Sequence, residues 1–225
     1  MATIFDCSDS AALLTGMRLA RGAIGRGELV VLPTDTVYGV AADAFDPLAV
    51  NRLLAAKGRT RQSPPPVLVP GIPTLDALTE EVPSEVRTLI QVFWPGALTV
   101  ILPARSSLHW DLGDTGGTVA LRMPADRYAL ELLAETGPLA VSSANLTGQP
   151  AALTAAEAEA MLGDSVAVYL DGGPAASGPS SGLPSTIVDA TPLLTPGGEL
   201  RIVREGAIAS AAILQVLADA RKAQP

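Results

Sequence analysis

The chain is poor in the side chains that most often carry covalent and metal chemistry, because its 225 residues include one cysteine and one histidine. The single cysteine, Cys7, excludes a disulfide within the chain and a zinc site built from several cysteines. The single histidine, His109, would have to serve any serine–histidine–aspartate triad, and it lies in a stretch of loop character at residues 107–111. We therefore expect an ordinary loop histidine and no chemistry of the triad type.

Lysine and aromatic residues are also scarce. Lys57 and Lys222 are the only lysines among the fifteen basic residues, and aromatic residues make up 4% of the chain. The net charge of −8 disfavours broad electrostatic binding to nucleic acid, because counterion release requires a basic face. The few aromatic side chains also leave little material for platforms on which bases could stack.

No run of apolar residues reaches the roughly 18 residues that a membrane-spanning helix needs, so we expect no association with a membrane. Residues 1–10 hold acids where a secretory signal would have bases, and we expect a cytoplasmic protein. Hydrophobic residues are abundant at 48%, against 17% charged residues, and the mean hydropathy is +0.34. Such a chain buries a sizeable core, which excludes wholesale disorder.

Helices and strands alternate irregularly along the chain. Apolar residues at helical spacing and capping signals predict helices over residues 10–25, 46–56, 83–93, 126–135, 154–162 and 209–220. Short apolar runs between turn residues predict strands over residues 28–32, 67–69, 98–102, 118–122, 139–142, 166–170, 185–188 and 200–204. No strict βαβ repeat connects them, so we predict an α/β protein with a twisted mixed β-sheet and packed helices.

Residues 171–184 are the one break in composition, since they are rich in glycine, serine and proline. By composition the stretch resembles a flexible linker, but only about 40 residues follow it. We therefore expect one domain over residues 1–225, in which residues 171–184 form a mobile loop placed to cover an active site.

Two polar segments follow predicted strands. Residues 33–40 (Pro-Thr-Asp-Thr-Val-Tyr-Gly-Val) offer dense hydrogen-bonding capacity beside a buried strand, or form a polar turn with Tyr38 packed over the core. Residues 142–148 (Ser-Ser-Ala-Asn-Leu-Thr-Gly) place hydroxyls and an amide at the end of a strand. That arrangement suits either a ligand crevice of an α/β sheet or a capped turn.

Cationic side chains mark two further places. Lys57, Arg59 and Arg61 follow a predicted helix, where they suit an anionic substrate such as a nucleoside triphosphate, or form a solvated patch. Thr118 and Arg122 share one face of a predicted strand. Arg122 is then either an inward-pointing carboxylate binder or an arginine on the solvent face of an edge strand.

The order of these segments along the chain is specific. Pro-Thr-Asp-Thr-Val-Tyr-Gly is followed by Ala-Lys-Gly-Arg, Trp-Pro-Gly-Ala-Leu-Thr, Thr-Val-Ala-Leu-Arg-Met-Pro, Ser-Ser-Ala-Asn-Leu-Thr-Gly, Pro-Ser-Thr-Ile-Val-Asp and Arg-Glu-Gly-Ala-Ile. This series resembles the YrdC-like family, whose members are threonylcarbamoyl-AMP synthases. The likeness extends over about residues 11–213, and the chain looks like the short, single-domain form of that fold.

The resemblance implies an ATP-consuming ligation. L-Threonine and bicarbonate form an N-carboxylated threonine, which attacks the α-phosphate of ATP to give threonylcarbamoyl-AMP and pyrophosphate. Mg²⁺ is expected to accompany ATP, and no protein side chain is identified as a metal ligand. The product would pass to the threonylcarbamoyl-transferase machinery that modifies the adenosine beside the anticodon (t6A37), so tRNA is an indirect partner.

The resemblance also assigns roles to residues of this chain. Lys57 and Arg59 are expected to be catalytic. The threonine site is expected to comprise Thr36, Arg122, Ser143 (or its neighbour Ser142) and Ser185. The nucleotide site is expected to comprise Lys57, Arg59, Ser63, Thr118, Asn145 and Arg204.

The chain departs from the family pattern at a few of these positions. Thr60 and Ser63 stand where proline and asparagine are common, and residues 64–69 lack a histidine that contacts threonine. Leu183-Pro184 precedes Ser185 where a glutamate is common. Two other functions are weighed: a non-catalytic RNA-binding or ribosome-associated module, which the acidic balance disfavours, and a carbamoyl-transfer enzyme, whose zinc-finger cysteines are absent here.

Overall fold

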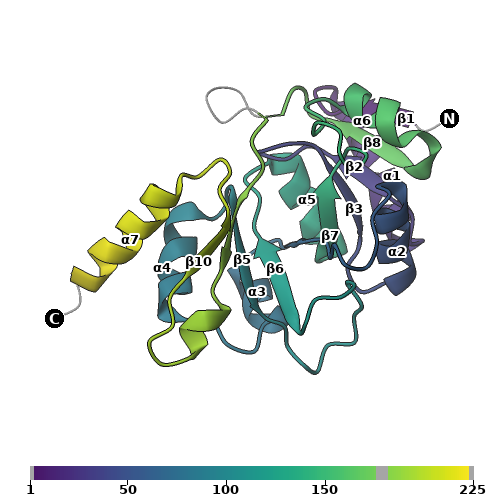
Figure 1. The fold of residues 1–225 in the computed structure, drawn as a ribbon. Helices are drawn as coiled ribbons and strands as arrows, with labels where there is room; N and C mark the ends of the chain where they lie inside the picture. Colours follow the sequence, from purple (N-terminus) through teal and green to yellow (C-terminus); the bar gives the residue numbers. More distant parts are fainter. Residues whose placement is uncertain (1–2, 176–181, 223–225) are drawn as a thin grey trace.

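A computed structural model describes residues 3–175 and 182–222, and it contains one mixed sheet of ten strands (Figure 1). The strands are β1 (Thr3–Asp6), β2 (Val30–Leu32), β3 (Gly39–Asp43), β4 (Val67–Leu68), β5 (Leu98–Pro103), β6 (Thr118–Arg122), β7 (Leu139–Ser143), β8 (Val168–Asp171), β9 (Thr186–Asp189) and β10 (Arg201–Arg204). Their order in the sheet is β1-β8-β2-β3-β7-β4-β6-β5-β9-β10. Residues 176–181 of the expected mobile loop lie outside the described residues.

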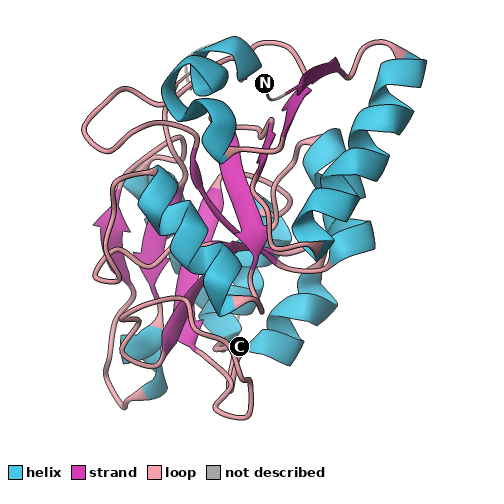
Figure 2. Ribbon diagram, turned by 90° about the vertical axis from the view of Figure 1, so that its right-hand side faces the viewer, coloured by secondary structure: helices cyan, strands magenta, loops and turns pink. Residues whose placement is uncertain are grey.

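In the part of the chain that the structure describes, seven α-helices pack against this sheet. They are α1 (Ser10–Gly25), α2 (Pro47–Ala56), α3 (Ile72–Leu78), α4 (Ser84–Phe93), α5 (Arg127–Thr136), α6 (Ala155–Leu162) and α7 (Ser210–Lys222). Figure 2 shows helices on both sides of the strands. Among the described residues, none of these helices combines the length and the apolar character that crossing a bilayer requires.

Side-chain oxygens satisfy the free N–H groups where several helices begin. The carboxylate of Asp9 accepts from Ala12 N at α1, and that of Asp126 accepts from the first N–H groups of α5. At α6, Thr154 Oγ1 accepts from Glu157 N, and the Glu157 carboxylate accepts from the backbone N–H that precedes Thr154. The capping signal at residues 154–157 therefore predicts this helix start correctly.

Side chains of the central strands alternate between two hydrophobic clusters, one on each face of the sheet. Val30 and Leu32 of β2 pack with α1 and α5, whereas Val31 packs on the other face with α2 and α6. The sheet is covered on both faces here, which explains why β2 is apolar at every position.

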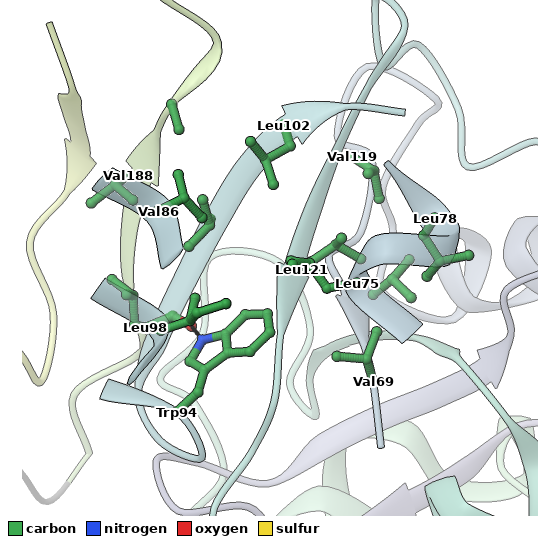
Figure 3. Close-up of a cluster of buried hydrophobic side chains, with 14 of the residues drawn as sticks. Val69, Leu75, Leu78, Val86, Trp94, Leu98, Leu102, Val119, Leu121 and Val188 are labelled. Atoms are coloured by element: carbon green, nitrogen blue, oxygen red, sulfur yellow. Dashed lines mark hydrogen bonds between the residues drawn. The ribbon is translucent and has the colours of Figure 1, made fainter. Parts of the chain in front are cut away.

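The half of the sheet that contains β5 and β6 is covered by helices on one face. Leu98 and Leu102 of β5 and Leu121 of β6 join a buried cluster with Trp94 and residues of α3, α4 and α7 (Figure 3). The intervening residues of β5 and β6 point to the opposite face of the sheet. That face forms the wall of a cavity.

The predicted α/β class with a twisted mixed sheet is confirmed, and all six predicted helices and eight predicted strands are present with small shifts at their ends. The sequence did not reveal β1, β3 and α3. Strand β3 consists largely of glycine and alanine, which are poor strand formers, and its central position between β2 and β7 makes it a strand. Helix α3 has seven residues, too few for a helical periodicity to be recognised.

The buried cluster of β5, β6 and the helices that cover them allows a prediction about the stability of the protein. Leu89 of α4 is fully buried in it, so Leu89→Ala removes buried apolar surface and leaves a void. We expect the free energy of unfolding to fall by about 2–5 kcal/mol, measured by chemical denaturation. Leu14→Ala on α1 is the matched control, since Leu14 is 71% exposed, and we expect a change within about 0.5 kcal/mol. Equal losses in the two variants would contradict this account of the core.

Candidate active site

A cavity of about 340 Å³ lies on the face of β5, β6 and β9 that the helices leave open. Its walls also include the segment between β2 and β3, three prolines before β4, and the end of β7. Such a volume is within the range of small-molecule sites. Among the described residues that line it, the charged side chains are Arg59, Arg122 and Arg204, and none is a carboxylate. The cavity is therefore cationic in a chain whose net charge is −8.

The segment between β2 and β3 forms a tight polar turn at the cavity wall. Thr34 Oγ1 donates to Val37 O at 2.6 Å and lies 3.0 Å from Thr36 Oγ1. Gly39 permits a close approach to β7, because a Cβ there would lie 2.7 Å from a methyl of Val141. Both interpretations of this segment hold, since Tyr38 is fully buried in the core while its neighbours line the cavity.

The Tyr38 hydroxyl connects this turn to the segment after β8. It donates to Gly173 O at 2.6 Å, accepts from Gly172 N at 3.0 Å, and lies 3.1 Å from a carboxylate oxygen of Asp171. Burial and the nearby Asp171 carboxylate raise the pKa of Tyr38, so the hydroxyl stays protonated and acts as a neutral structural group.

Arg122 at the end of β6 points into the cavity and is 6% exposed, so the inward orientation is confirmed and the solvent-face alternative is wrong. Its Nε donates to Gly96 O at 2.9 Å, Nη1 to Thr36 Oγ1 at 2.9 Å and Nη2 to Asp35 Oδ1 at 2.7 Å. Burial lowers the pKa of Arg122, and Asp35 opposes that shift. A guanidinium has five N–H groups, so two remain for a ligand.

Arg204 of β10 lies across the cavity and is held by the residue that precedes β9. Its Nη2 donates to Ser185 O at 2.7 Å, and Ser185 Oγ lies 2.8 Å from Thr99 Oγ1 of β5. The pKa of Arg204 is lowered first by burial and then by the charges of Arg122 and Arg59. Arg122 and Arg59 thus repel Arg204 electrostatically, and a polyanion in the cavity would relieve that repulsion.

The cationic run at residues 57–61 does not form a single patch, which corrects the simplest interpretation of the sequence. Arg59 Nη1 donates to Ser142 Oγ at 3.0 Å at the cavity wall. Arg61 points to the surface, where it pairs with Asp111 at 2.7 Å. Lys57 is fully buried beneath the turn that follows β7. The separation arises because the helix ends at Ala56 and each later side chain takes its own direction.

Most of the predicted site residues converge on this cavity. The lining includes Thr36, Arg59, Thr118, Arg122, Ser143, Ser185 and Arg204, and it also includes Ser142. Lys57, Ser63 and Asn145 are not among the lining residues: Ser63 is exposed, and the Asn145 amide donates to Leu146 O and Gln149 O.

Several lining residues were missed from the sequence. Thr34 stands in the same polar segment as Thr36 and lines the cavity with it. Asp35, between them, lies outside the lining and accepts a hydrogen bond from Arg122 Nη2. Thr99 was detectable in principle, because this threonine alternates with the apolar residues Leu98 and Val100 on β5 and therefore lies on the opposite face of the strand.

Hydroxyl groups and guanidinium groups dominate the polar wall of the cavity. In the described part of the chain, no group of three or more histidine, cysteine or acidic side chains is placed to hold a metal ion. The arrangement can therefore bind and orient anionic reactants and stabilise charge that develops on them. Among the described residues that line the cavity, no histidine, lysine or carboxylate stands beside these hydroxyls to activate one as a nucleophile.

Comparison with known proteins agrees with this geometry. Residues 22–206 match the family Sua5_yciO_yrdC, described as "Telomere recombination". The chain is 50% identical over 217 residues to a Mycobacterium tuberculosis protein named "Putative threonylcarbamoyl-AMP synthase", with 96% of each chain covered.

Solved structures extend the comparison. Sua5 of Pyrococcus abyssi, solved in complex with L-threonine, superimposes with a TM-score of 0.84 at 31% identity. The match covers 96% of this chain and 61% of the archaeal chain. Escherichia coli YciO shares the fold, with a TM-score of 0.76 at 22% identity over 92% of this chain and 96% of YciO. By the extent of the family match and the identity to its relatives, the chain belongs to the Sua5/YciO/YrdC family.

Proposed function

We propose that this chain is an L-threonylcarbamoyladenylate synthase, which makes threonylcarbamoyl-AMP and pyrophosphate from L-threonine, bicarbonate and ATP. The observation that carries the proposal is the convergence of Arg59, Arg122 and Arg204 on one hydroxyl-lined cavity. Relatives that bear the name threonylcarbamoyl-AMP synthase, and a related structure that holds L-threonine, support the choice of substrates.

The reaction needs no covalent intermediate with the protein. The threonine amine attacks the carbon of bicarbonate and loses a proton, and a water molecule leaves, which gives a carbamate. A carbamate oxygen then attacks the α-phosphorus of ATP while the bond to the β-phosphate breaks, so pyrophosphate departs. The protein's part is to align the reactants and to offset the charge that accumulates on the phosphates.

The cavity divides these tasks among its residues. Arg59, which donates to Ser142 of β7, and Arg204 of β10 both line the cavity and are placed to bind the triphosphate. Arg122, with two free N–H groups, is placed to bind the threonine carboxylate beside Thr36 and Ser185. These assignments give Arg59 a catalytic role through its contact with the reacting phosphates.

Other predicted contacts belong to the same proposal. Thr118 and Ser143 line the cavity and can reach nucleotide and threonine respectively. Ser63 and Asn145 stay predictions for the nucleotide, and both lie outside the cavity lining of this structure.

Mg²⁺ enters this proposal as part of the substrate. Mg²⁺ prefers carboxylate and phosphate oxygens, and the described cavity lining supplies no carboxylate. The ion would therefore be carried by the phosphates of ATP. The product would pass in the cytoplasm to the transferase machinery that forms t6A at position 37 of tRNA, so this chain would meet tRNA only indirectly.

The proposed reaction predicts a strict dependence on substrates. We expect pyrophosphate release from ATP when L-threonine and bicarbonate are both present, measured with a coupled phosphate assay and mass detection of the adenylate. Omission of either substrate should reduce release to the background, because the attacking carbamate requires both. Pyrophosphate release that is independent of threonine would contradict the proposal. The absence of release with every amino acid tested would contradict it as well.

Arg59 provides a second prediction. Arg59→Ala removes a cation from the cavity wall while the core is untouched, so we expect the rate of adenylate formation to fall by about a hundredfold or more. Arg21→Ala is the matched control, since Arg21 pairs with Glu135 on the exposed face of α1. We expect the control to keep the parental rate, and circular dichroism to show both variants folded. An unchanged rate in Arg59→Ala would rule out this role.

A further inference from the structure

Lys57 is a buried cation whose partners are all neutral oxygens. Its side chain is fully buried at the end of α2. Its Nζ donates to Asn145 O at 2.6 Å, lies 3.4 Å from Asn145 Oδ1, and donates to Ser143 O. Burial and then the neighbouring Arg59 lower the pKa of Lys57 to about 8. Within the described chain, no ion pair joins Lys57 to a carboxylate.

The number of donors decides what this amino group can bind. A lysine ammonium has three N–H groups, and three acceptors surround Lys57 Nζ. A phosphate oxygen would have to displace one of these contacts, of which the one to Asn145 Oδ1 at 3.4 Å is the weakest. Lys57 is also not among the residues that line the cavity. A direct contact with ATP, as the family resemblance implies, therefore conflicts with this arrangement.

The backbone of Lys57 holds the same turn at a second point. Lys57 O accepts from Thr147 N at 3.0 Å and from Thr147 Oγ1 at 2.8 Å. The turn at residues 143–147 is thus held at its start by the side chain of Lys57 and at its end by the main chain of Lys57. This turn continues β7, whose last residues Ser142 and Ser143 line the cavity, and Ser142 Oγ accepts from Arg59.

We propose that Lys57 is a positioning residue, which fixes the turn at residues 143–147 so that the end of β7 presents its hydroxyls to the substrates. It acts through the turn and not through contact with the phosphates. The inference deepens the proposed function, because it concerns the site for the same substrates. It also explains why a lysine stands here, since a buried carbonyl cluster needs several donors from one side chain.

Chemical modification tests the burial directly, because the chain has two lysines. Lys222 on α7 has a side chain 75% exposed and serves as the internal reference. We expect reductive methylation with formaldehyde to modify Lys222 and leave Lys57 unmodified in the folded protein, with and without Mg–ATP, as read by peptide mass spectrometry. In guanidinium both lysines should react, which shows that the reagent is competent.

A lysine that binds phosphate behaves differently in this experiment. Lys57 would then react in the free protein and be protected by Mg–ATP, and that result would overturn the proposal. Reaction of Lys57 regardless of Mg–ATP would overturn it too, since the amino group would not be held by the turn. The accessibility of Lys57 does not depend on turnover, so failure of the proposed reaction is detected separately.

Thr147→Val tests the positioning role without touching the lysine. It removes the Oγ1 bond to Lys57 O and keeps the shape of the side chain. We expect the KM for ATP to rise by about fivefold, the effect of one hydrogen bond, with kcat within about a factor of two and the melting temperature nearly unchanged.

The matched control is Thr15→Val on α1, where the threonine hydroxyl also bonds a backbone carbonyl, that of Ala11, on an exposed surface. We expect this control to leave KM and kcat at their parental values. A Thr147→Val variant with an unchanged KM would overturn the proposal, because the tie between Lys57 and the turn would then have no influence on the site. A loss of stability without a change in KM would do the same.

Discussion

Repulsion among three guanidinium groups is the constraint on which the cavity depends. Arg59, Arg122 and Arg204 line one cavity, in which Arg59 and Arg122 repel Arg204, and burial removes part of the hydration of Arg122 and Arg204. The protein offsets these costs with oxygens behind the arginines: Asp35 and a backbone carbonyl for Arg122, and Ser185 for Arg204. On the side that faces the cavity the arginines stay positively charged, and an anionic substrate would neutralise this charge.

The same strands that carry the core also fix the direction of these arginines. On β6, Leu121 enters the buried cluster and its neighbour Arg122 faces the cavity, because successive side chains point to opposite faces. On β5, Leu98 and Thr99 divide in the same way. The packing that resists a shift of Leu121 therefore also resists a shift of Arg122, so the core gives the site its rigidity.

Sequence patterns could predict the features that repeat with the period of a helix or of a strand. Alternation on a strand predicted that Thr118 and Arg122 share one face but left open whether that face is the inward one. Six helices followed from apolar spacing and caps. The directions of Lys57 and Arg61 could not be predicted, because side chains after a helix end follow no period and their partners lie about 50 to 90 residues away. Strand β3 was hidden for a related reason, since its neighbours in the sheet and not its own residues make it a strand.

The turn between β2 and β3 has a consequence for what Thr36 can offer. Thr34 gives its single hydroxyl proton to Val37 O, and its Oγ1 accepts from the backbone N–H groups of Thr36 and Val37. One lone pair of Thr36 Oγ1 is occupied by the guanidinium of Arg122. The hydroxyl of Thr34 is therefore saturated, and Thr36 Oγ1 keeps its own proton and its second lone pair for a ligand. At this point the wall can therefore bind a group that carries a hydrogen on nitrogen or oxygen as well as a group that offers only oxygen lone pairs.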